Sequence, residues 1–146
     1  MTTRFTRRPM MAAQLASVRR RIGPTEPADA PLLGAVERQL GEYFSGERTA
    51  FDLPLDTPGS QFQERAWAEL KRIPYGETIS YGELAARVGV RAGSRAVGRA
   101  NGANRMAIII PCHRVIAAGG GLGGYGGGLD AKRSLLELEG AIPPAA

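Results

Sequence analysis

The only cysteine of the chain stands directly before its only histidine, in the stretch "IIIPCHRVI" that runs from Ile108 to Ile116. A thiolate is a strong nucleophile, but an unperturbed thiol has a pKa of about 8.5 and needs a base or a positive field to ionise at neutral pH. His113 is the candidate base. Because neighbouring side chains on a strand point to opposite faces, we do not expect direct contact between Cys112 and His113 unless Pro111 begins a turn, and a bridging water is the easier geometry.

A histidine that acts as a base needs an acceptor that orients its ring. The carboxylates that follow His113 in the chain are Asp130, Glu137 and Glu139, and their spacing does not select one of them. One cysteine excludes an internal disulfide, and one cysteine with one histidine gives too few ligands for a zinc site. We therefore expect neither a metal nor a cofactor.

The charge distribution predicts a polyanionic partner. The 146 residues carry a net charge of +5, and no carboxylate lies between Glu83 and Asp130. Six arginines fall in that interval, namely Arg87, Arg91, Arg95, Arg99, Arg105 and Arg114. Such a region is typical of nucleic-acid binding, although a solvated face of a helix gives the same pattern. No apolar run approaches the ~20 residues of a membrane span, so we expect a cytoplasmic protein without membrane contact.

The reactive residues must be positioned by helices, and the sequence predicts four of them before Cys112. Apolar residues four apart predict a helix over residues 32–44 that ends before Gly46. Ser60 with Gln63 predicts a capping box at the start of a second helix, and Ser80 with Glu83 predicts another at the start of a third. A fourth helix is expected from Ser94. The last two helices have the spacing of a helix-turn-helix unit.

The helix "SRAVGRANGAN" is rich in small residues and places Arg95 and Arg99 one turn apart. Glycine in a helix costs up to about 1 kcal/mol relative to alanine, so we expect a compensating reason for Gly98 and Gly102. One reason is close approach to the DNA minor groove, which is only about 6 Å wide. The other is close packing between helices inside the protein.

The last third of the chain is expected to form the pocket. The β-branched run Ile108 to Ile110 predicts a buried strand that leads into Pro111. The loop "AAGGGLGGYGGGLD" has enough glycine to bring its backbone close to a ligand. A final helix follows, and we expect Asp130 to cap it.

The combination of "SRAVGRANGAN", "IPCHRVI" and "GGYGGGLDAK" resembles the O⁶-alkylguanine-DNA alkyltransferases, and the similarity begins at "FQERAWAELKRIPYGETISYGELA". This resemblance implies a mostly α fold, α+β overall, with a helix-turn-helix, short strand segments and a glycine-rich active-site loop. It implies DNA repair by single-turnover transfer of an alkyl group from O⁶-alkylguanine, with O⁴-alkylthymine as a further candidate, to Cys112 after base flipping. The implied partner is double-stranded alkylated DNA, bound through the minor groove by a monomer at the nucleoid.

The resemblance also implies roles for individual residues. Cys112 accepts the alkyl group, His113 is the water-bridged base, and Glu139 orients it. Tyr81 rotates the DNA backbone and donates a proton to the departing guanine, and Asn104 belongs to the hinge and active-site network. The implied DNA-binding residues are Arg95, which replaces the extruded nucleotide, with Tyr81, Ala96, Gly98, Arg99 and Arg114. The implied pocket residues are Val115, Tyr125, Gly126 and Gly127.

The N-terminal part departs from the family pattern. Members usually carry a β-sheet domain there, whereas "MTTRFTRRPMMAAQLASVRRRIG" shows no alternating strands. We therefore expect a basic tail or amphipathic helix over residues 1–24, a remnant of the N-terminal domain with a linker over 25–58, and the DNA-binding and active-site domain over 59–146. Arg91 and Arg105 stand where members commonly have proline, and both are expected to add charge near the DNA.

Two other functions would use the same features differently. A non-catalytic lesion-binding protein of the same fold would replace the acceptor cysteine, which this chain retains. A thiol hydrolase would use the Cys-His pair with turnover and an oxyanion site, and would leave the helix-turn-helix unexplained.

Overall fold

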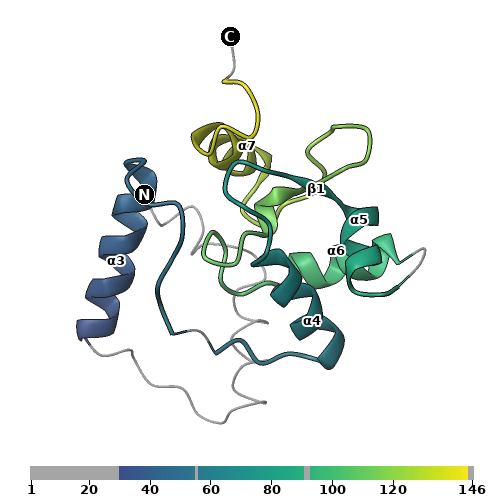
Figure 1. The fold of residues 1–146 in the computed structure, drawn as a ribbon, viewed down its shortest axis with the longest axis horizontal. Coiled ribbons are helices and arrows are strands. Elements are labelled where there is room, and N and C mark those ends of the chain that lie inside the picture. The colour runs from purple at the N-terminus through teal and green to yellow at the C-terminus, as the bar shows by residue number, and fades with distance from the viewer. Residues whose placement is uncertain (1–29, 55, 91–92, 145–146) are drawn as a thin grey trace.

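The computed structural model describes residues 30–54, 56–90 and 93–144. Figure 1 shows helix α3 (Ala30–Phe44) at the left, apart from the other helices. These are α4 (Gln61–Leu70), α5 (Tyr81–Arg87), α6 (Ser94–Gly102) and α7 (Leu129–Leu138). The expected helix over residues 32–44 is present, and Gly46 follows it at a positive φ of 84°. No helix of the described ranges is long and apolar enough to cross a membrane.

Helix α4 is anchored at both of its ends by interactions that its sequence specifies. The predicted capping box is confirmed, because the Ser60 hydroxyl accepts from the Gln63 N–H and the Gln63 side chain accepts from the Ser60 N–H. Trp67 is buried and donates its indole N–H to the carbonyl of Ala100 at 2.8 Å. This bond fixes α4 against α6.

Helices α5 and α6 form the predicted helix-turn-helix. Ser80 caps α5 by accepting from the Glu83 N–H at 3.0 Å, while the Glu83 carboxylate pairs with Arg87 at 2.7 Å. The two helices bury Leu84, Ala85, Val97 and Ala100 in a common core with α4. Helix α6 begins at Ser94 as predicted.

The expected strand over Ile108 to Ile110 is wrong, because this segment is a tight turn. Ala107 and Ile110 share only an isolated bridge, and Ile108 has a φ of 75°, which is rare for a β-branched residue. The cause is the buried side chain of Asn104, which donates to the Ile110 carbonyl at 2.8 Å and accepts from the Met106 N–H at 3.0 Å. One amide side chain thus satisfies backbone groups that a neighbouring strand would otherwise bind.

A two-stranded parallel sheet links the helix-turn-helix to the cysteine segment. Strand β1 (Ile79–Ser80) pairs with β2 (Val115–Ile116), with Ile79 opposite Val115. The short 3₁₀ helix η1 (Cys112–Arg114) directly precedes β2. The fold is therefore mostly α with a small sheet, as predicted. Helix α7 has Gly128 rather than the expected Asp130 at its N-cap, and Asp130 lies in its first turn.

Candidate active site and DNA-binding helix

Cys112 lies on a turn and forms part of the wall of a cavity of about 500 Å³. Pro111 precedes η1, so the alternative that a turn begins there is the correct one. The backbone is held on both sides, because the Cys112 N–H donates to the Ile110 carbonyl at 2.8 Å and the Asn101 side chain donates to the Cys112 carbonyl at 3.2 Å. The sulfur is thereby fixed at the cavity wall.

His113 points away from solvent and binds Glu139. Its Nε2 lies 2.8 Å from Glu139 Oε2, and both side chains are fully buried. Of the three carboxylates that the sequence left open, the structure selects Glu139. Asp130 is exposed at the start of α7, and neither it nor Glu137 takes this position.

The electrostatics of this pair define which nitrogen carries the proton. Burial would raise the pKa of Glu139, but hydrogen bonds from His113 and Arg114 outweigh it and lower that pKa to about 2. An ionised carboxylate only accepts, so His113 Nε2 donates to it and Nδ1 of the neutral ring keeps its lone pair. Burial lowers the pKa of His113, although Glu139 acts in the opposite direction. The lowered pKa favours the neutral ring. Among the described residues, none bonds to the buried Nδ1.

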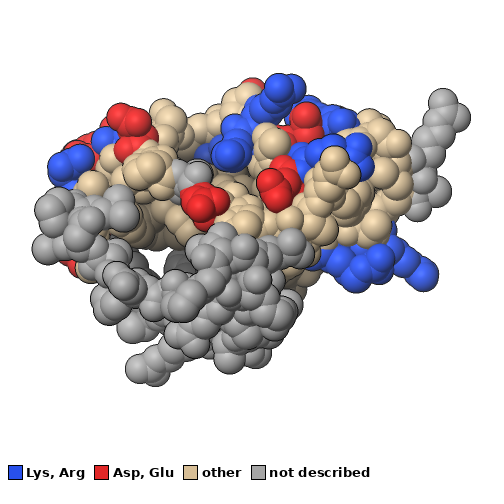
Figure 2. Space-filling view, turned by 90° about the horizontal axis from the view of Figure 1, so that it is seen from below, with Lys and Arg blue, Asp and Glu red and all other residues tan. Residues whose placement is uncertain are grey.

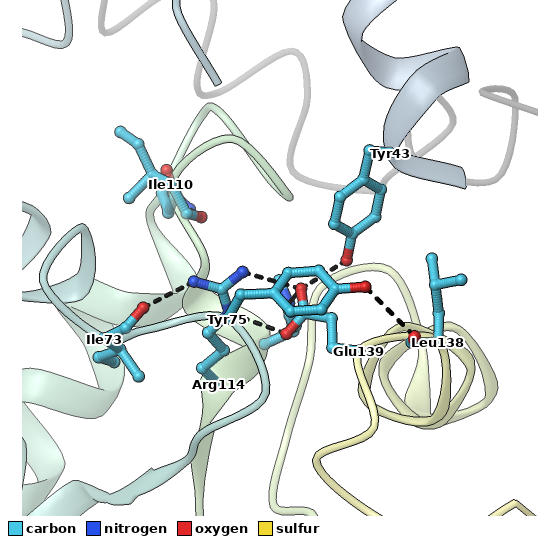
Figure 3. A network of polar contacts seen from close by, with 9 residues as sticks. Tyr43, Ile73, Tyr75, Ile110, Arg114, Leu138 and Glu139 are labelled. Atoms are coloured by element: carbon cyan, nitrogen blue, oxygen red, sulfur yellow. Dashed lines mark hydrogen bonds and ion pairs between the residues drawn. The ribbon is translucent and has the colours of Figure 1, made fainter. Parts of the chain in front are cut away.

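Arg114 does not occupy the DNA-binding position that the sequence suggested. Its side chain is buried, and Figure 3 shows its guanidinium turned toward Glu139 and the carbonyl of Ile73. It donates from Nε to Oε1 and from Nη2 to Oε2 of Glu139, both at 2.9 Å, and from Nη1 to the Ile73 carbonyl at 2.7 Å. Arg114 therefore holds Glu139 in its ionised form. The arginine-rich composition of this region concealed that role.

The cavity brings together residues from α5, α6 and the glycine-rich loop. Six predicted residues line it, namely Tyr81, Arg95, Gly98, Cys112, Tyr125 and Gly126. Four lining residues were missed by the sequence reasoning, namely Ser94, Asn101, Gly102 and Gly124. Val115 is not among the lining residues, because β2 buries it in the core, and Gly127 is not among them either.

The side chain of Tyr81 packs against the glycine-rich loop. Its hydroxyl donates to the Gly124 carbonyl at a long 3.4 Å. A Cβ at Gly123 would lie 3.0 Å from the Tyr81 ring, and Gly123 has a φ of 71°, so glycine is needed here. Burial raises the pKa of Tyr81, with a further contribution from Cys112, so the phenol stays protonated at neutral pH.

Lys132 supports the glycine-rich loop beside the cavity and was missed by the sequence reasoning. It is fully buried on α7 and donates from Nζ to the carbonyls of Val115 at 2.6 Å and Gly124 at 3.2 Å, and also to that of Leu122. Burial lowers its pKa to about 8, against the effect of Cys112, and the amine remains protonated at pH 7. Its position between Ala131 and Leu135 on the buried face of α7 was the available signal.

Helix α6 presents its arginines to solvent at the cavity mouth. Ser94, Arg95 and Arg99 are exposed, whereas Ala96 and Gly98 are half-buried. Among the residues that the structure describes, a Cβ on Gly98 would touch only Tyr81 at 4.0 Å, and one on Gly102 would meet nothing within 4 Å. Internal packing therefore does not require these glycines, and approach of an external partner becomes the better explanation. In Figure 2 the right-hand end, where α5 and α6 lie in Figure 1, shows basic side chains.

Two further predicted residues lie away from the cavity. Asn104 holds the turn before Pro111 and does not line the cavity. Arg105 lies with its guanidinium 5.1 Å from the centre of the Trp67 ring and with a buried nitrogen, so it packs against α4 rather than projecting freely toward DNA. Arg91 lies outside the described residues. Within those residues, no group of three His, Cys, Asp or Glu side chains could hold a metal ion.

The fold and the site together combine a helix-turn-helix unit, typical of DNA-binding proteins, with a cavity of about 500 Å³ that has Cys112 in its wall. Comparison with known protein families agrees. Residues 61–141 match the DNA-binding domain of 6-O-methylguanine DNA methyltransferase, and residues 10–57 match the ribonuclease-like domain of the same family. The chain belongs to this methyltransferase family.

Individual relatives are similar over most of the chain. A methylated-DNA–protein-cysteine methyltransferase of Mycolicibacterium paratuberculosis is 58% identical over 125 residues, which are 86% of this chain and 74% of the relative. The crystal structure of Mycobacterium tuberculosis OGT in complex with DNA superposes with a TM-score of 0.72 at 56% identity, covering 74% of this chain and 67% of that one. Schizosaccharomyces pombe Atl1 in complex with DNA containing O⁶-carboxymethylguanine gives a TM-score of 0.51 at 30% identity, over 57% of this chain and 79% of that one.

Proposed function

We propose that this chain repairs DNA by transferring the alkyl group of O⁶-alkylguanine irreversibly to the sulfur of Cys112. The observation that carries the proposal is the position of Cys112 in the wall of a cavity beside α6, backed by the buried His113–Glu139 pair. The family membership and the names of the relatives support the same activity.

The residues of the site account for the proton movements of the transfer. His113 Nδ1 takes the proton of the Cys112 thiol through a bridging water, since Nε2 is committed to Glu139. The thiolate then attacks the alkyl carbon, the carbon–oxygen bond breaks, and its electron pair leaves with guanine. The neutral phenol of Tyr81 at the cavity wall donates a proton to the departing base. The product is a thioether on Cys112.

We propose that α6 enters the minor groove and that the damaged base swings into the cavity. The open space beside Gly98 and Gly102 lets a narrow partner approach the helix. Arg95 is exposed at the cavity mouth and fills the stack that the extruded base leaves, which offsets part of the few kcal/mol that extrusion costs. Arg99, one turn further on, is placed to bind phosphate.

The reaction is expected to occur once per molecule. The chain contains one cysteine, so no second thiol can remove the alkyl group. We propose that a monomer acts, at the cytoplasmic nucleoid where the DNA substrate lies. We further propose residues 59–146 as the DNA-binding and active-site unit. O⁴-alkylthymine is the second candidate substrate.

A labelling experiment tests the proposal. The protein is incubated with duplex DNA that carries one O⁶-methylguanine with an isotopically labelled methyl group, and is then digested for peptide mass analysis. We expect the label on the peptide that contains Cys112 and none on a Cys112→Ser variant. Lesion-selective binding without any transfer would instead support a lesion-binding protein of the same fold, the alternative that the retained cysteine disfavours.

A further inference from the structure

Helix α3 contributes a side chain to the buried relay, although it lies far from the cysteine in the sequence. The Tyr43 hydroxyl donates to Glu139 Oε2 at 2.6 Å across a separation of 96 residues, and Tyr43 is fully buried. Figure 3 shows the tyrosine extending from the helix toward the carboxylate that also binds Arg114. The relay therefore has a partner in the N-terminal part of the chain.

An aromatic cluster holds this hydroxyl in position. The Tyr43 ring lies 5.3 Å from that of Phe44, 5.6 Å from Phe51 and 6.2 Å from Tyr75, measured between ring centres. The contacts with Phe44 and Tyr75 are edge-on and the contact with Phe51 is tilted, and aromatic contacts at these distances are favourable and restrict the ring. Tyr75 belongs to the same cluster, but its hydroxyl donates to the Leu138 carbonyl at 3.3 Å. The two tyrosines thus share a cluster and differ in the acceptor of their hydroxyl groups.

We propose that Tyr43 is a positioning residue of the transfer reaction. Its hydroxyl fixes the carboxylate of Glu139 and limits how strongly that carboxylate stabilises the protonated form of His113. This inference rests on the proposed function and adds a role for α3. Oε2 of Glu139 accepts from three donors, which are Tyr43 at 2.6 Å, His113 at 2.8 Å and Arg114 at 2.9 Å. The negative charge that Tyr43 and Arg114 compensate is not available to stabilise an imidazolium ring.

The groups around the carboxylate set the direction of the effect. Those that bond to Glu139 or act on His113 are Tyr43 from α3, Arg114 from η1 and Lys132 from α7. The hydroxyl of Tyr75, from the segment after α4, donates to the Leu138 carbonyl instead. Burial and the two cations lower the pKa of His113, and the charge of Glu139 raises it. Without the Tyr43 hydroxyl, more of that charge acts on His113. Its pKa then rises, and less of the neutral base is present at mildly acidic pH.

The test compares Tyr43→Phe with the matched hydroxyl deletion Tyr75→Phe. The rate constant of methyl transfer from duplex DNA is measured against pH, together with the fraction of molecules that react. We expect the acidic limb of the Tyr43→Phe profile to move to higher pH, with a loss of about tenfold at its acidic end, the effect of one hydrogen bond to a charged group. The fully reacting fraction and the Tyr75→Phe profile should match the wild type.

A second readout separates this inference from the proposed function. His113 is the only histidine of the chain, so its ring nitrogens give unambiguous ¹⁵N resonances whose titration follows its pKa directly. A higher midpoint in Tyr43→Phe supports the inference even if the wild type transferred no methyl group. An unchanged midpoint, or an equal change in Tyr75→Phe, overturns it while leaving the transfer activity intact.

A third variant guards against loss of folding in Tyr43→Phe. Incorporation of 3-fluorotyrosine at position 43 alone keeps the ring and makes the hydroxyl a stronger donor. The midpoint of His113 should then move to lower pH, opposite to the effect of Tyr43→Phe. Movement in the same direction as Tyr43→Phe, or none, contradicts the proposed charge sharing.

Discussion

Replacing Glu139 with glutamine removes the charge around which three buried side chains are arranged. Arg114 donates twice to this carboxylate at 2.9 Å, and its own side chain is only 8% exposed. The glutamine variant would leave the guanidinium buried without a counter-charge. Removing one partner of such a pair typically costs about 3–5 kcal/mol.

The lowered pKa of Glu139 gives a second figure, which combines the hydrogen bonds from His113, Arg114 and Tyr43 with the opposing effect of burial. A change from the usual 4.5 to about 2 in the folded protein corresponds to about 3 kcal/mol at neutral pH. Because the folded-state value is lowered, this stabilisation is fully present above about pH 4.5 and is lost as the pH falls toward 2. The wild type and Glu139→Gln should therefore differ most near neutral pH and converge in acid.

Urea unfolding followed by circular dichroism at pH 7 measures the difference, and thermal unfolding should show a fall of about 10 °C or more in Tm. Glu83→Gln is the matched control, because Glu83 pairs with Arg87 on the surface, where their side chains are 49% and 36% exposed. That variant should lose less than about 0.5 kcal/mol. A loss below about 1 kcal/mol in Glu139→Gln, or one equal to the control, would refute the reasoning.

Three further variants test other parts of the site. Arg95→Ala should slow transfer from duplex DNA by about tenfold or more and leave transfer from free O⁶-benzylguanine unchanged, because only base extrusion needs this side chain. Arg99→Ala is its control and should weaken the affinity for DNA and lower the salt dependence of that affinity. Tyr81→Phe should reduce the single-turnover rate about a hundredfold if the phenol donates to the leaving base, and an unchanged rate would exclude that role. Lys132→Met removes the Nζ donor from the Val115 and Gly124 carbonyls and should cost about 2 kcal/mol in urea unfolding, with slower transfer because the loop loosens. A variant as stable as the wild type would contradict the structural role.

Local signals in the sequence predicted the helices well. The Ser60 capping box and the start of α6 at Ser94 depend on residues within one turn of each other, and both are present. The strand expected over Ile108 to Ile110 is wrong because one buried side chain just before this segment determines its backbone path. Asn104 satisfies the backbone of that segment, and neither hydrophobicity nor β-branching reports on such a bond.

The candidate site was predictable where residue type limits the chemistry. The single cysteine and the single histidine were the only candidates of their kinds for a reactive pair, and the resemblance supplied Glu139. The surroundings of that pair were not predictable, because they depend on contacts between distant segments. Arg114 was counted among surface cations although its partner carboxylate buries it, and the contribution of Tyr43 comes from a helix 96 residues before Glu139.

The central claim is that Cys112 is consumed by the lesion, one alkyl group for each protein molecule. Intact-protein mass measured after incubation with an excess of duplex DNA containing O⁶-methylguanine tests it most directly. The account predicts a gain of one methyl group on every active molecule, no further gain with time, and no gain in Cys112→Ser. Methyl loss from the DNA beyond the amount of protein, or a mass gain that persists in Cys112→Ser, would contradict it.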